Sequence, residues 1–366
     1  MSRICILYTG GTIGMVRTDN GYAPKAGYLE EEMGHLRDLH RPEMPEWDLF
    51  EFDPLLDSSN IAYPEWNQMA RAIEANYDKY DGFVVLHGTD TMSYSASALS
   101  FMLDGLAKPV VFTGAQIPLC EPRSDGKDNL ITALLIASQG IANEVSLYFG
   151  NRLLRGNRST KQSADGLIAF ASPDYPDLAR AGIHIDYRVR SLNANATSTV
   201  DLAALRKAAG FGTAGGADAE GSEPETPANG LTVTEIKKSR IGVIKLFPGI
   251  QFDLFEPIMT DRLDGLVLET FGAGNIPGYD ASLLPLITRA IENGTIVVVC
   301  TQCPQGTVTL GTYETGSALL RAGAVSGYNM TTEATVTKLA YLYSLGLPRA
   351  EIRRLMEQNL RGELTR

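Results

Sequence analysis

A threonine hydroxyl that follows a buried strand and a pair of glycines is the first feature of this sequence that could do chemistry. Residues 4–8 (ICILY) form an unbroken apolar run, typical of a strand buried on both faces, and TGGT follows at once. Adjacent glycines permit a sharp turn and a close approach to the backbone. Because ligands bind beyond the carboxyl ends of strands in open α/β sheets, Thr12 is a candidate nucleophile. A purely structural glycine turn is the alternative reading of the same residues.

A second group of this kind, HGTDT, follows the apolar run at 82–86. Thr89 and Asp90 place a hydroxyl beside a carboxylate, a pair that could orient a nucleophile or bind an ammonium group. The alternative is that Asp90 caps the helix that follows. His87 is more typical of a hydrogen-bonded residue near the core than of a metal ligand, since the sequence holds no HExxH and no other histidine spacing that suits a metal.

A lysine in a polar stretch supplies a candidate base. Lys161 closes the sequence RSTK, and a lysine that loses solvent at the ligand edge of a sheet has a lowered pKa and can act on a hydroxyl. A solvated lysine is the alternative. The lone pair Cys300 and Cys303 indicates ordinary packing and one loop thiol rather than a zinc site or a redox dithiol, because no second pair exists and Pro304 follows.

The elements that must position these residues alternate between strands and helices. Further apolar runs lie at 109–112 and 144–149, and helical spacing predicts helices at 64–78, 93–103 and 129–138. This alternation predicts an α/β fold with a mainly parallel sheet flanked by helices. The polar segment 17–27, which contains Tyr22, is predicted as a long loop that could serve as a mobile lid.

Composition changes sharply in the second half of the chain. Residues 209–230 are rich in glycine and acidic residues and poor in apolar ones, which indicates a flexible linker. We therefore predict an N-terminal domain at 1–200, a connecting region at 201–240 and a smaller C-terminal α/β domain at 241–366. Strands are expected in the smaller domain at 241–247, 265–270 and 295–300, with helices at 282–293, 316–322, 332–344 and 349–358.

Charge and composition exclude several classes of partner. The net charge of −11 argues against nucleic acid and anionic membranes. Four cysteines are too few for a disulfide scaffold in 366 residues. The N-terminal residues do not form a signal peptide, and no apolar run reaches the roughly 18 residues of a membrane-spanning helix. The cytoplasm is the expected compartment.

Taken together, TGGTIG and HGTDT resemble the bacterial-type L-asparaginases, in particular their cytosolic type I group. Further matching segments extend the resemblance over nearly the whole chain, among them HRPEMP, RSDG, RGNRSTK, EATVTKL and QNLRGELT. The resemblance implies hydrolysis of the side-chain amide of L-asparagine to L-aspartate and ammonia, with minor activity on L-glutamine as an option. It implies no metal and no cofactor.

The resemblance also implies roles for individual residues. Thr12 would attack the amide carbon and form an acyl-enzyme, with Tyr22 close to its hydroxyl. Thr89, Lys161 and Asp90 would form a second hydroxyl–base–carboxylate group. Side chains expected to hold the α-carboxylate and α-amino groups of the substrate are Ser58, Ser59 and Asp90. Asn275 is expected to reach an active site across a subunit contact, because the family forms homo-oligomers, commonly tetramers built from intimate dimers.

One residue departs from the family pattern in a way that bears on regulation. Some cytosolic members bind asparagine at a second, activating site. In LVLETFGAGN, Glu269 stands where a basic residue is expected in members that have this site. We therefore predict that the effector site is absent or altered.

Two alternatives to an asparaginase remain. One is the related amidase subunit of a tRNA-dependent amidotransferase, which usually carries an extra N-terminal domain, whereas TGGTIG begins here at residue 9. The other is a two-domain amino-acid-binding or sensing protein with little turnover. Release of ammonia by the purified protein would separate these readings.

Overall fold

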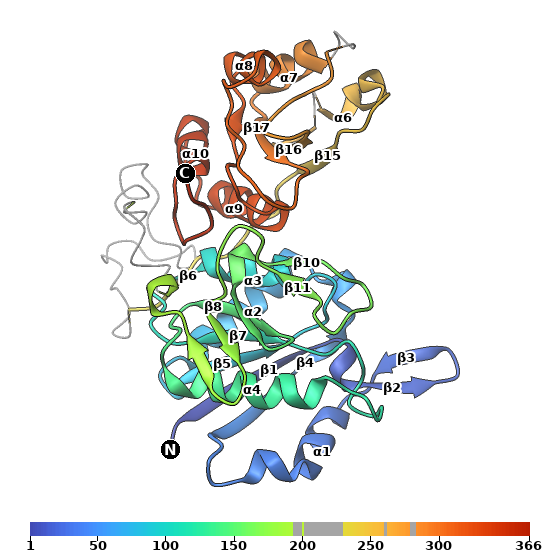
Figure 1. The fold of residues 1–366 in the computed structure, drawn as a ribbon, viewed down its shortest axis with the longest axis vertical. Helices are drawn as coiled ribbons and strands as arrows, with labels where there is room; N and C mark the ends of the chain where they lie inside the picture. The colour runs from blue at the N-terminus through green and yellow to red at the C-terminus, as the bar shows by residue number, and fades with distance from the viewer. Residues whose placement is uncertain (193–199, 201–229, 260–261, 279–282) are drawn as a thin grey trace, which may run out of the picture. The chain divides into compact units, whose positions relative to one another are not determined.

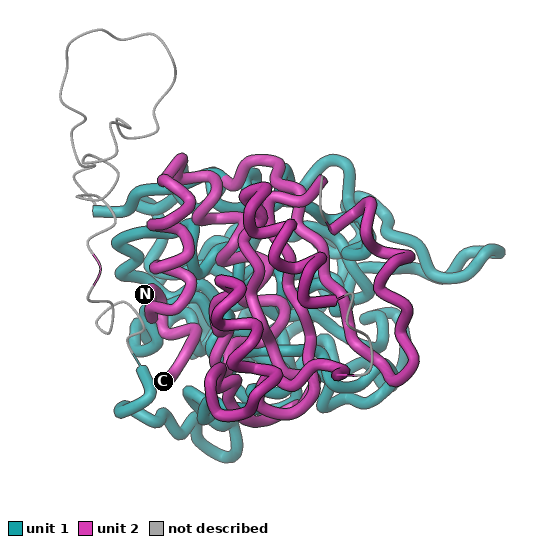
Figure 2. The backbone as a smooth tube through the Cα atoms, turned by 90° about the horizontal axis from the view of Figure 1, so that it is seen from above, with its two compact units in different colours: residues 1–196, 225–235 teal, residues 197–224, 236–366 magenta. Residues whose placement is uncertain are grey.

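A computed structural model of the chain describes residues 1–192, 200, 230–259, 262–278 and 283–366. These residues belong to two compact units, shown in different colours in Figure 2: unit 1 covers 1–196 and 225–235, and unit 2 covers 197–224 and 236–366. The linker predicted at 209–230 lies outside the described residues except at Gly230. The predicted limits of the domains remain a prediction.

The centre of unit 1 is an eight-stranded sheet with the order β13-β12-β9-β8-β7-β5-β1-β4 (Figure 1). Its strands β4, β1, β5, β7 and β8 are mutually parallel, and β9, β12 and β13 continue the sheet in antiparallel fashion. The predicted mainly parallel sheet is thereby confirmed. The strand bounds are β1 Arg3–Gly10, β4 Glu46–Leu56, β5 Gly82–Leu86, β7 Val110–Thr113, β8 Val145–Phe149, β9 Arg152–Arg155, β12 Ala179–Ala181 and β13 Ile185–Tyr187.

Helices cover both faces of this sheet. On one face the side chains of Ile4, Ile6 and Tyr8 pack in a buried cluster with residues of α1 (Tyr28–His35) and α4 (Gly126–Gln139). The helices α2 (Tyr63–Asn76) and α3 (Met92–Met102) contact the strands on the opposite face (Figure 1). Every residue of β5 is buried, as expected for a strand covered on both sides.

The segment predicted as a long loop around Tyr22 is instead largely a hairpin. Strand β2 (Met15–Thr18) pairs antiparallel with β3 (Gly21–Pro24), and only Asp19 and Asn20 connect them. Gly21 has a φ of 106°, and the Thr18 hydroxyl donates a hydrogen bond of 2.7 Å to its carbonyl. A polar turn of this kind closes a hairpin. The polar composition of 17–21 was misleading because the apolar residues of the two short strands lie on either side of it, Met15 and Val16 before and Tyr22 and Ala23 after.

Unit 2 is a smaller α/β unit around a four-stranded sheet with the order β15-β16-β17-β18, in which all pairs are parallel. The predicted strands and helices of this part are confirmed with small shifts of their ends. The strands are β15 Ile241–Lys245, β16 Gly265–Thr270, β17 Ile296–Thr301 and β18 Val325–Ser326; the helices are α6 Glu256–Met259, α7 Leu283–Glu292, α8 Glu314–Ala322, α9 Thr332–Ser344 and α10 Arg349–Met356. Cys300 is buried and Cys303 is exposed, as predicted.

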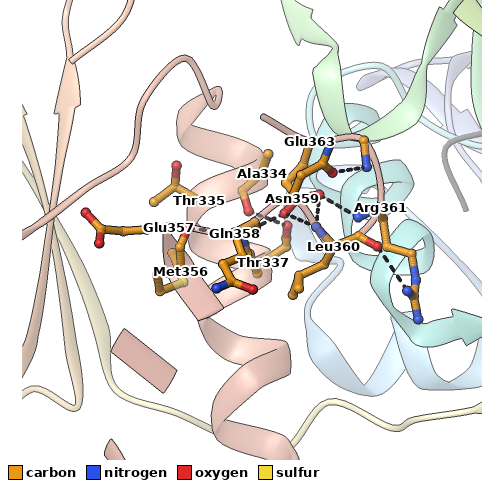
Figure 3. Close-up of polar contacts among 12 residues, drawn as sticks. Ala334, Thr335, Thr337, Met356, Glu357, Gln358, Asn359, Leu360, Arg361 and Glu363 are labelled. Atoms are coloured by element: carbon orange, nitrogen blue, oxygen red, sulfur yellow. Dashed lines mark hydrogen bonds and ion pairs between the residues drawn. The ribbon is translucent and has the colours of Figure 1, made fainter. Parts of the chain in front are cut away.

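A buried ion pair ties the C-terminal segment to α9. Lys338 of α9 donates to a carboxylate oxygen of Glu363 at 2.6 Å, and neither side chain is exposed. Glu363 also accepts hydrogen bonds from the backbone N–H groups of Leu360 and Arg361 (Figure 3). Lys338 donates further to the carbonyls of Met356 and Gln358, so its three N–H groups have partners.

Within the described part of the chain, none of the helices is both long enough and apolar enough to cross a membrane.

Candidate active site

Four neighbouring parallel strands send their carboxyl ends to one edge of the sheet in unit 1, and each end supplies wall residues to a single cavity. The cavity has a volume of about 200 Å³. Its walls include Ser58 after β4, Thr12 after β1, Thr89 after β5 and Gln116 after β7, in the same order as the strands. Lys161 adds the remaining polar wall from the short strand β10 (Thr160–Lys161), which pairs with β11 (Phe170–Ala171).

The glycines of the two motifs bring three of these strand ends into direct contact. Gly11 has a φ of 92°, and a Cβ atom there would lie 2.4 Å from the Cα atom of Gly88. A Cβ atom on Gly88 would in turn lie 2.6 Å from the Ser58 hydroxyl oxygen. At Gly11 both the backbone conformation and the space favour glycine, whereas at Gly88 the space next to Ser58 does so. Thr12 begins the 3₁₀ helix Thr12–Gly14 directly after this contact.

The structure brings together Thr89, Lys161 and Asp90, which the resemblance implies as a second hydroxyl–base–carboxylate group. Lys161 Nζ lies 2.8 Å from Thr89 Oγ1 and 2.7 Å from Asp90 Oδ1. The Lys161 side chain is only 18% exposed and lines the cavity. Asp90 does not cap α3, because the N-cap residue is Thr91 and no side chain caps this helix. The binding interpretation of Asp90 is thus favoured over the capping one.

Thr12 lines the same cavity as this group. No hydrogen-bond partner of its hydroxyl is found among the residues that the structure describes. A hydroxyl in this setting is available to a ligand, since it is not committed to a neighbouring side chain. Its role as nucleophile remains a prediction.

The hydroxyl of Tyr22 has partners other than Thr12. It donates a hydrogen bond of 2.7 Å to a carboxylate oxygen of Glu121 and accepts one of 3.3 Å from Arg17. Tyr22 is 43% exposed and does not line the cavity. In this conformation the hairpin holds Tyr22 at Glu121, and the expected approach to Thr12 stays a prediction.

Ser58, Ser59 and Asn275, which are expected to bind the substrate, differ in whether they line the cavity. Ser58 is buried and lines the cavity. Ser59 is exposed and does not line it, and its backbone N–H donates to Asp57 at 2.8 Å. Asn275 belongs to unit 2, where it forms a bridge with Phe271 and accepts a hydrogen bond of 3.2 Å from Thr315.

Two polar residues of the cavity wall were not among the predicted site residues. Asp57 and Gln116 both line the cavity. The available signal was positional: each follows a strand that neighbours β1 or β5 in the sheet, as Thr12 and Thr89 do. The strand order was needed to apply this signal, because the sequence does not show which strand ends are adjacent.

The cavity carries an excess of negative charge. Its walls hold the carboxylates of Asp57 and Asp90 against the single ammonium group of Lys161. A ligand with an ammonium group would restore neutrality, and hydrogen bonds between charged partners are about twice as strong as those between neutral ones.

His87 lies behind this wall as a structural residue. Its Nδ1 atom is 2.7 Å from the carbonyl oxygen of Gly88, and its Nε2 atom is 2.8 Å from the Ser95 hydroxyl. Complete burial lowers the pKa of His87 to about 4, so the ring is neutral near pH 7. The predicted role as a hydrogen-bonded core residue is confirmed.

Comparison with known proteins agrees with this geometry. Residues 3–193 match the family described as "Asparaginase, N-terminal", and residues 240–356 match "Glutaminase/Asparaginase C-terminal domain". The chain is 47% identical to L-asparaginase 1 of Escherichia coli strain K12 over 99% of this chain and 98% of that protein. Two solved structures are similar over 100% of this chain and 99% of theirs: L-asparaginase I of Vibrio cholerae (44% identity, TM-score 0.83) and the thermostable L-asparaginase of Thermococcus kodakarensis (31%, 0.81).

Proposed function

Since this chain belongs to the asparaginase family, we propose that it uses Thr12 to hydrolyse the side-chain amide of L-asparagine, giving L-aspartate and ammonia. The enzyme is an L-asparaginase by its similarity to such enzymes over nearly the full length of both chains. The observation that carries the proposed mechanism is that Thr12 lines one cavity with the bonded group of Thr89, Lys161 and Asp90.

The reaction has two halves in this proposal. In the first, the Thr12 oxygen forms a bond to the amide carbon, and the bond from that carbon to nitrogen breaks. The proton of the Thr12 hydroxyl ends on the departing nitrogen, which leaves as ammonia. In the second half, a water oxygen forms a bond to the acyl carbon and the bond to Thr12 breaks. One proton of this water passes to the Thr12 oxygen, and the other leaves the new carboxyl group of aspartate at neutral pH.

The surrounding groups serve these steps in different ways. A threonine hydroxyl is nearly un-ionised at neutral pH and needs a group nearby that handles its proton. Thr89 and Lys161 form such a group on the cavity wall. The negative charge that develops on the amide oxygen needs fixed donors, which backbone N–H groups of the glycine-rich turns supply; one such donor lowers the barrier by about 3 kcal/mol.

The charge of the cavity suits an amino acid that carries an amide. Asp90 uses Oδ1 for Lys161, and the net negative charge of the walls favours the α-ammonium group of asparagine. Ser58 offers a hydroxyl to the α-carboxylate, with Ser59 as the neighbouring candidate. Tyr22 would join the site if the hairpin released Glu121. The amidotransferase subunit and the sensing protein are not favoured by the comparisons.

A Thr12→Val variant tests the assignment of the nucleophile. Valine keeps the shape of threonine but lacks the hydroxyl, so ammonia release from L-asparagine should fall to background while the circular dichroism spectrum and melting temperature stay near those of the wild type. Thr12→Ser retains a hydroxyl and should keep measurable activity. A Thr12→Val variant that retained a tenth of the wild-type rate would remove Thr12 as nucleophile.

We also propose a cytoplasmic homo-oligomer, a dimer or tetramer, in which Asn275 contributes to a site of a neighbouring subunit. The family resemblance supports this assembly. Light scattering coupled to size-exclusion chromatography measures the mass directly, and a monomer at working concentration would contradict the proposal. Loss of activity in Asn275→Ala without loss of assembly would support the role of this residue.

A further inference from the structure

Gln116 is an uncharged residue of the cavity wall, and the two ends of its side-chain amide form hydrogen bonds to different partners. Its amide oxygen lies 3.0 Å from the Thr89 hydroxyl oxygen. Its amide nitrogen lies 3.2 Å from the carbonyl oxygens of both Ala164 and Gly166. The backbone is fixed as well, because the N–H groups of Gln116 and Ile117 each donate to Asp125 at 3.0 Å.

These contacts settle which end of the amide faces Thr89. Carbonyl oxygens only accept hydrogen bonds, so the group that faces Ala164 and Gly166 must be the NH₂ of Gln116. The oxygen of Gln116 therefore faces Thr89, and this oxygen also only accepts. Since the Thr89 hydroxyl has a single hydrogen, that hydrogen points at Gln116.

The direction of the Thr89 hydrogen also fixes the direction of the other hydrogen bonds that the Thr89 hydroxyl can form. A hydroxyl oxygen has two lone pairs besides its hydrogen. One lone pair accepts from Lys161 Nζ at 2.8 Å, and Lys161 also donates to Asp90. The other lone pair of Thr89 is left for the cavity that Thr89 lines. Toward a ligand, Thr89 is then an acceptor and not a donor.

We infer that Gln116 is a positioning residue that keeps the Thr89 hydroxyl an acceptor toward the cavity and so favours an amide substrate over its carboxylate product. This inference rests on the proposed function and deepens it. An amide NH₂ group or a water molecule offers the hydrogen that Thr89 can accept. The side-chain carboxylate of L-aspartate offers only oxygen atoms at neutral pH, and two acceptors repel.

The same arrangement defines what Lys161 must do before it can act as a base. In the observed state Lys161 donates the hydrogen that lies between it and Thr89. To take the proton of Thr89, the lysine must first be neutral, and the Thr89 hydrogen must turn from Gln116 to Lys161. Gln116 thus competes with Lys161 for the only hydrogen of Thr89.

Two substitutions at Gln116 separate its two contacts. One contact sets the direction in which the Thr89 hydroxyl points, and the other holds the 164–166 segment. Gln116→Met is similar in length but accepts no strong hydrogen bond, so the Thr89 hydrogen is free to turn toward the cavity. Gln116→Glu still accepts from Thr89 but cannot donate to Ala164 and Gly166. Gln162→Met is the matched control, because Gln162 does not line the cavity and its side-chain amide donates a hydrogen bond of 3.3 Å to the carbonyl of Ile168.

The experiment measures kcat and KM for L-asparagine and, by calorimetry, the affinity for L-aspartate, in the wild type and all three variants. We expect Gln116→Met to bind L-aspartate about tenfold more tightly, because Thr89 can then donate to the carboxylate, and to lose about tenfold in kcat with a smaller change in KM. Gln116→Glu should not gain affinity for L-aspartate. Gln162→Met should match the wild type in all three quantities.

The results that would overturn this inference differ from those that would overturn the proposed function. Unchanged or weaker L-aspartate binding in Gln116→Met, or an equal gain in Gln116→Met and Gln116→Glu, would overturn the inference. General damage to the fold would weaken binding rather than tighten it, so it cannot imitate the expected result. A wild type that releases no ammonia would overturn the proposed function, while the calorimetric comparison would still decide the role of Gln116.

Discussion

His87 shows how a single buried side chain next to a reactive wall is kept out of the chemistry. Both ring nitrogens have partners, Gly88 on one side and Ser95 on the other, and the Ser95 hydroxyl also accepts from Trp66 at 3.0 Å. Since a carbonyl accepts only, the hydrogen of the neutral ring must lie on Nδ1. The ring thereby fixes the peptide between β5 and Thr89, and it does not line the cavity.

The lowered pKa of His87 makes the stability of the protein depend on pH. The folded protein holds the ring neutral down to about pH 4, whereas the unfolded chain takes up a proton near 6.5, so the unfolded state binds more protons between these values. The free energy of unfolding should therefore fall by about 3 kcal/mol from this group as the pH drops from 6.5 to 4.

Urea unfolding of the wild type and His87→Gln between pH 4 and 7.5 measures this contribution. Glutamine retains a donor and an acceptor but does not titrate, so the variant should lose less stability toward low pH than the wild type. His184→Gln, at an exposed histidine, should follow the wild type. Parallel curves for His87→Gln and the wild type would show that His87 is not the titrating group.

At the scale of elements, the C-terminal segment depends on a buried charge rather than on a helix or strand. Burial by itself would raise the pKa of Glu363, but the Lys338 ammonium group and two backbone N–H groups bring it below its usual value. The carboxylate therefore stays charged, and its contribution to stability is present above the ordinary pKa of a glutamate and is lost as the pH falls below it.

Removing one partner of the Lys338–Glu363 pair should lower the free energy of unfolding. We expect Lys338→Met to lower the free energy of unfolding by about 3–5 kcal/mol, because it leaves a charged carboxylate buried. The double variant Lys338→Met with Glu363→Leu should recover part of that loss. Arg354→Met breaks the surface pair with Glu351 and should cost less than about 1 kcal/mol. Urea unfolding checks all three, and a similar small loss for Lys338→Met would contradict the buried-charge argument.

The elements of both units could be predicted because their patterns are strong. Buried runs such as 82–86 and the amphipathic spacing that defines α2 depend on local sequence alone. The hairpin around Tyr22 could not be predicted from composition, because the polar run at 17–21 separates the apolar residues of its two short strands. The Lys338–Glu363 pair joins residues distant in sequence, and nothing in either local pattern indicates the partner.

The residues of the candidate site also differ in how far the sequence alone could indicate them. Thr12, Thr89 and Asp90 stand in local motifs that follow apolar runs, so the sequence could single them out as candidates before the fold was known. Gln116 follows a strand in a similar way, but its relevance depends on strand order and on contacts with the 164–166 segment. Such a residue becomes visible only when side-chain partners are known.

At the scale of the whole molecule, Glu269 bears on whether asparagine regulates the enzyme. Its carboxylate accepts a hydrogen bond of 2.5 Å from Thr332 and lies 3.9 Å from Lys245 Nζ. A carboxylate here repels the carboxylate of a second asparagine, whereas a basic residue would attract it. We therefore expect hyperbolic dependence of the initial rate on L-asparagine concentration.

Initial rates of ammonia release over a wide range of L-asparagine concentrations test this expectation. A sigmoidal curve for the wild type would contradict it, above all if Glu269→Arg abolished the sigmoidal shape. The same measurement with L-glutamine gives the preference between the two amides. Lys245→Met, which removes the neighbouring cation but leaves Glu269, serves as the control and should not create cooperativity.

The residues of the cavity wall come from successive strand ends, so the ribosome makes them one after another. A ribosome makes the chain from its N-terminus, so Thr12 emerges first, Thr89 and Gln116 follow, and Lys161 comes last. Every nascent chain therefore carries Thr12, the proposed nucleophile, long before Lys161 is made. Under the proposed mechanism, a growing polypeptide stays inert toward the cell's free asparagine until the strand that bears Lys161 has left the ribosome.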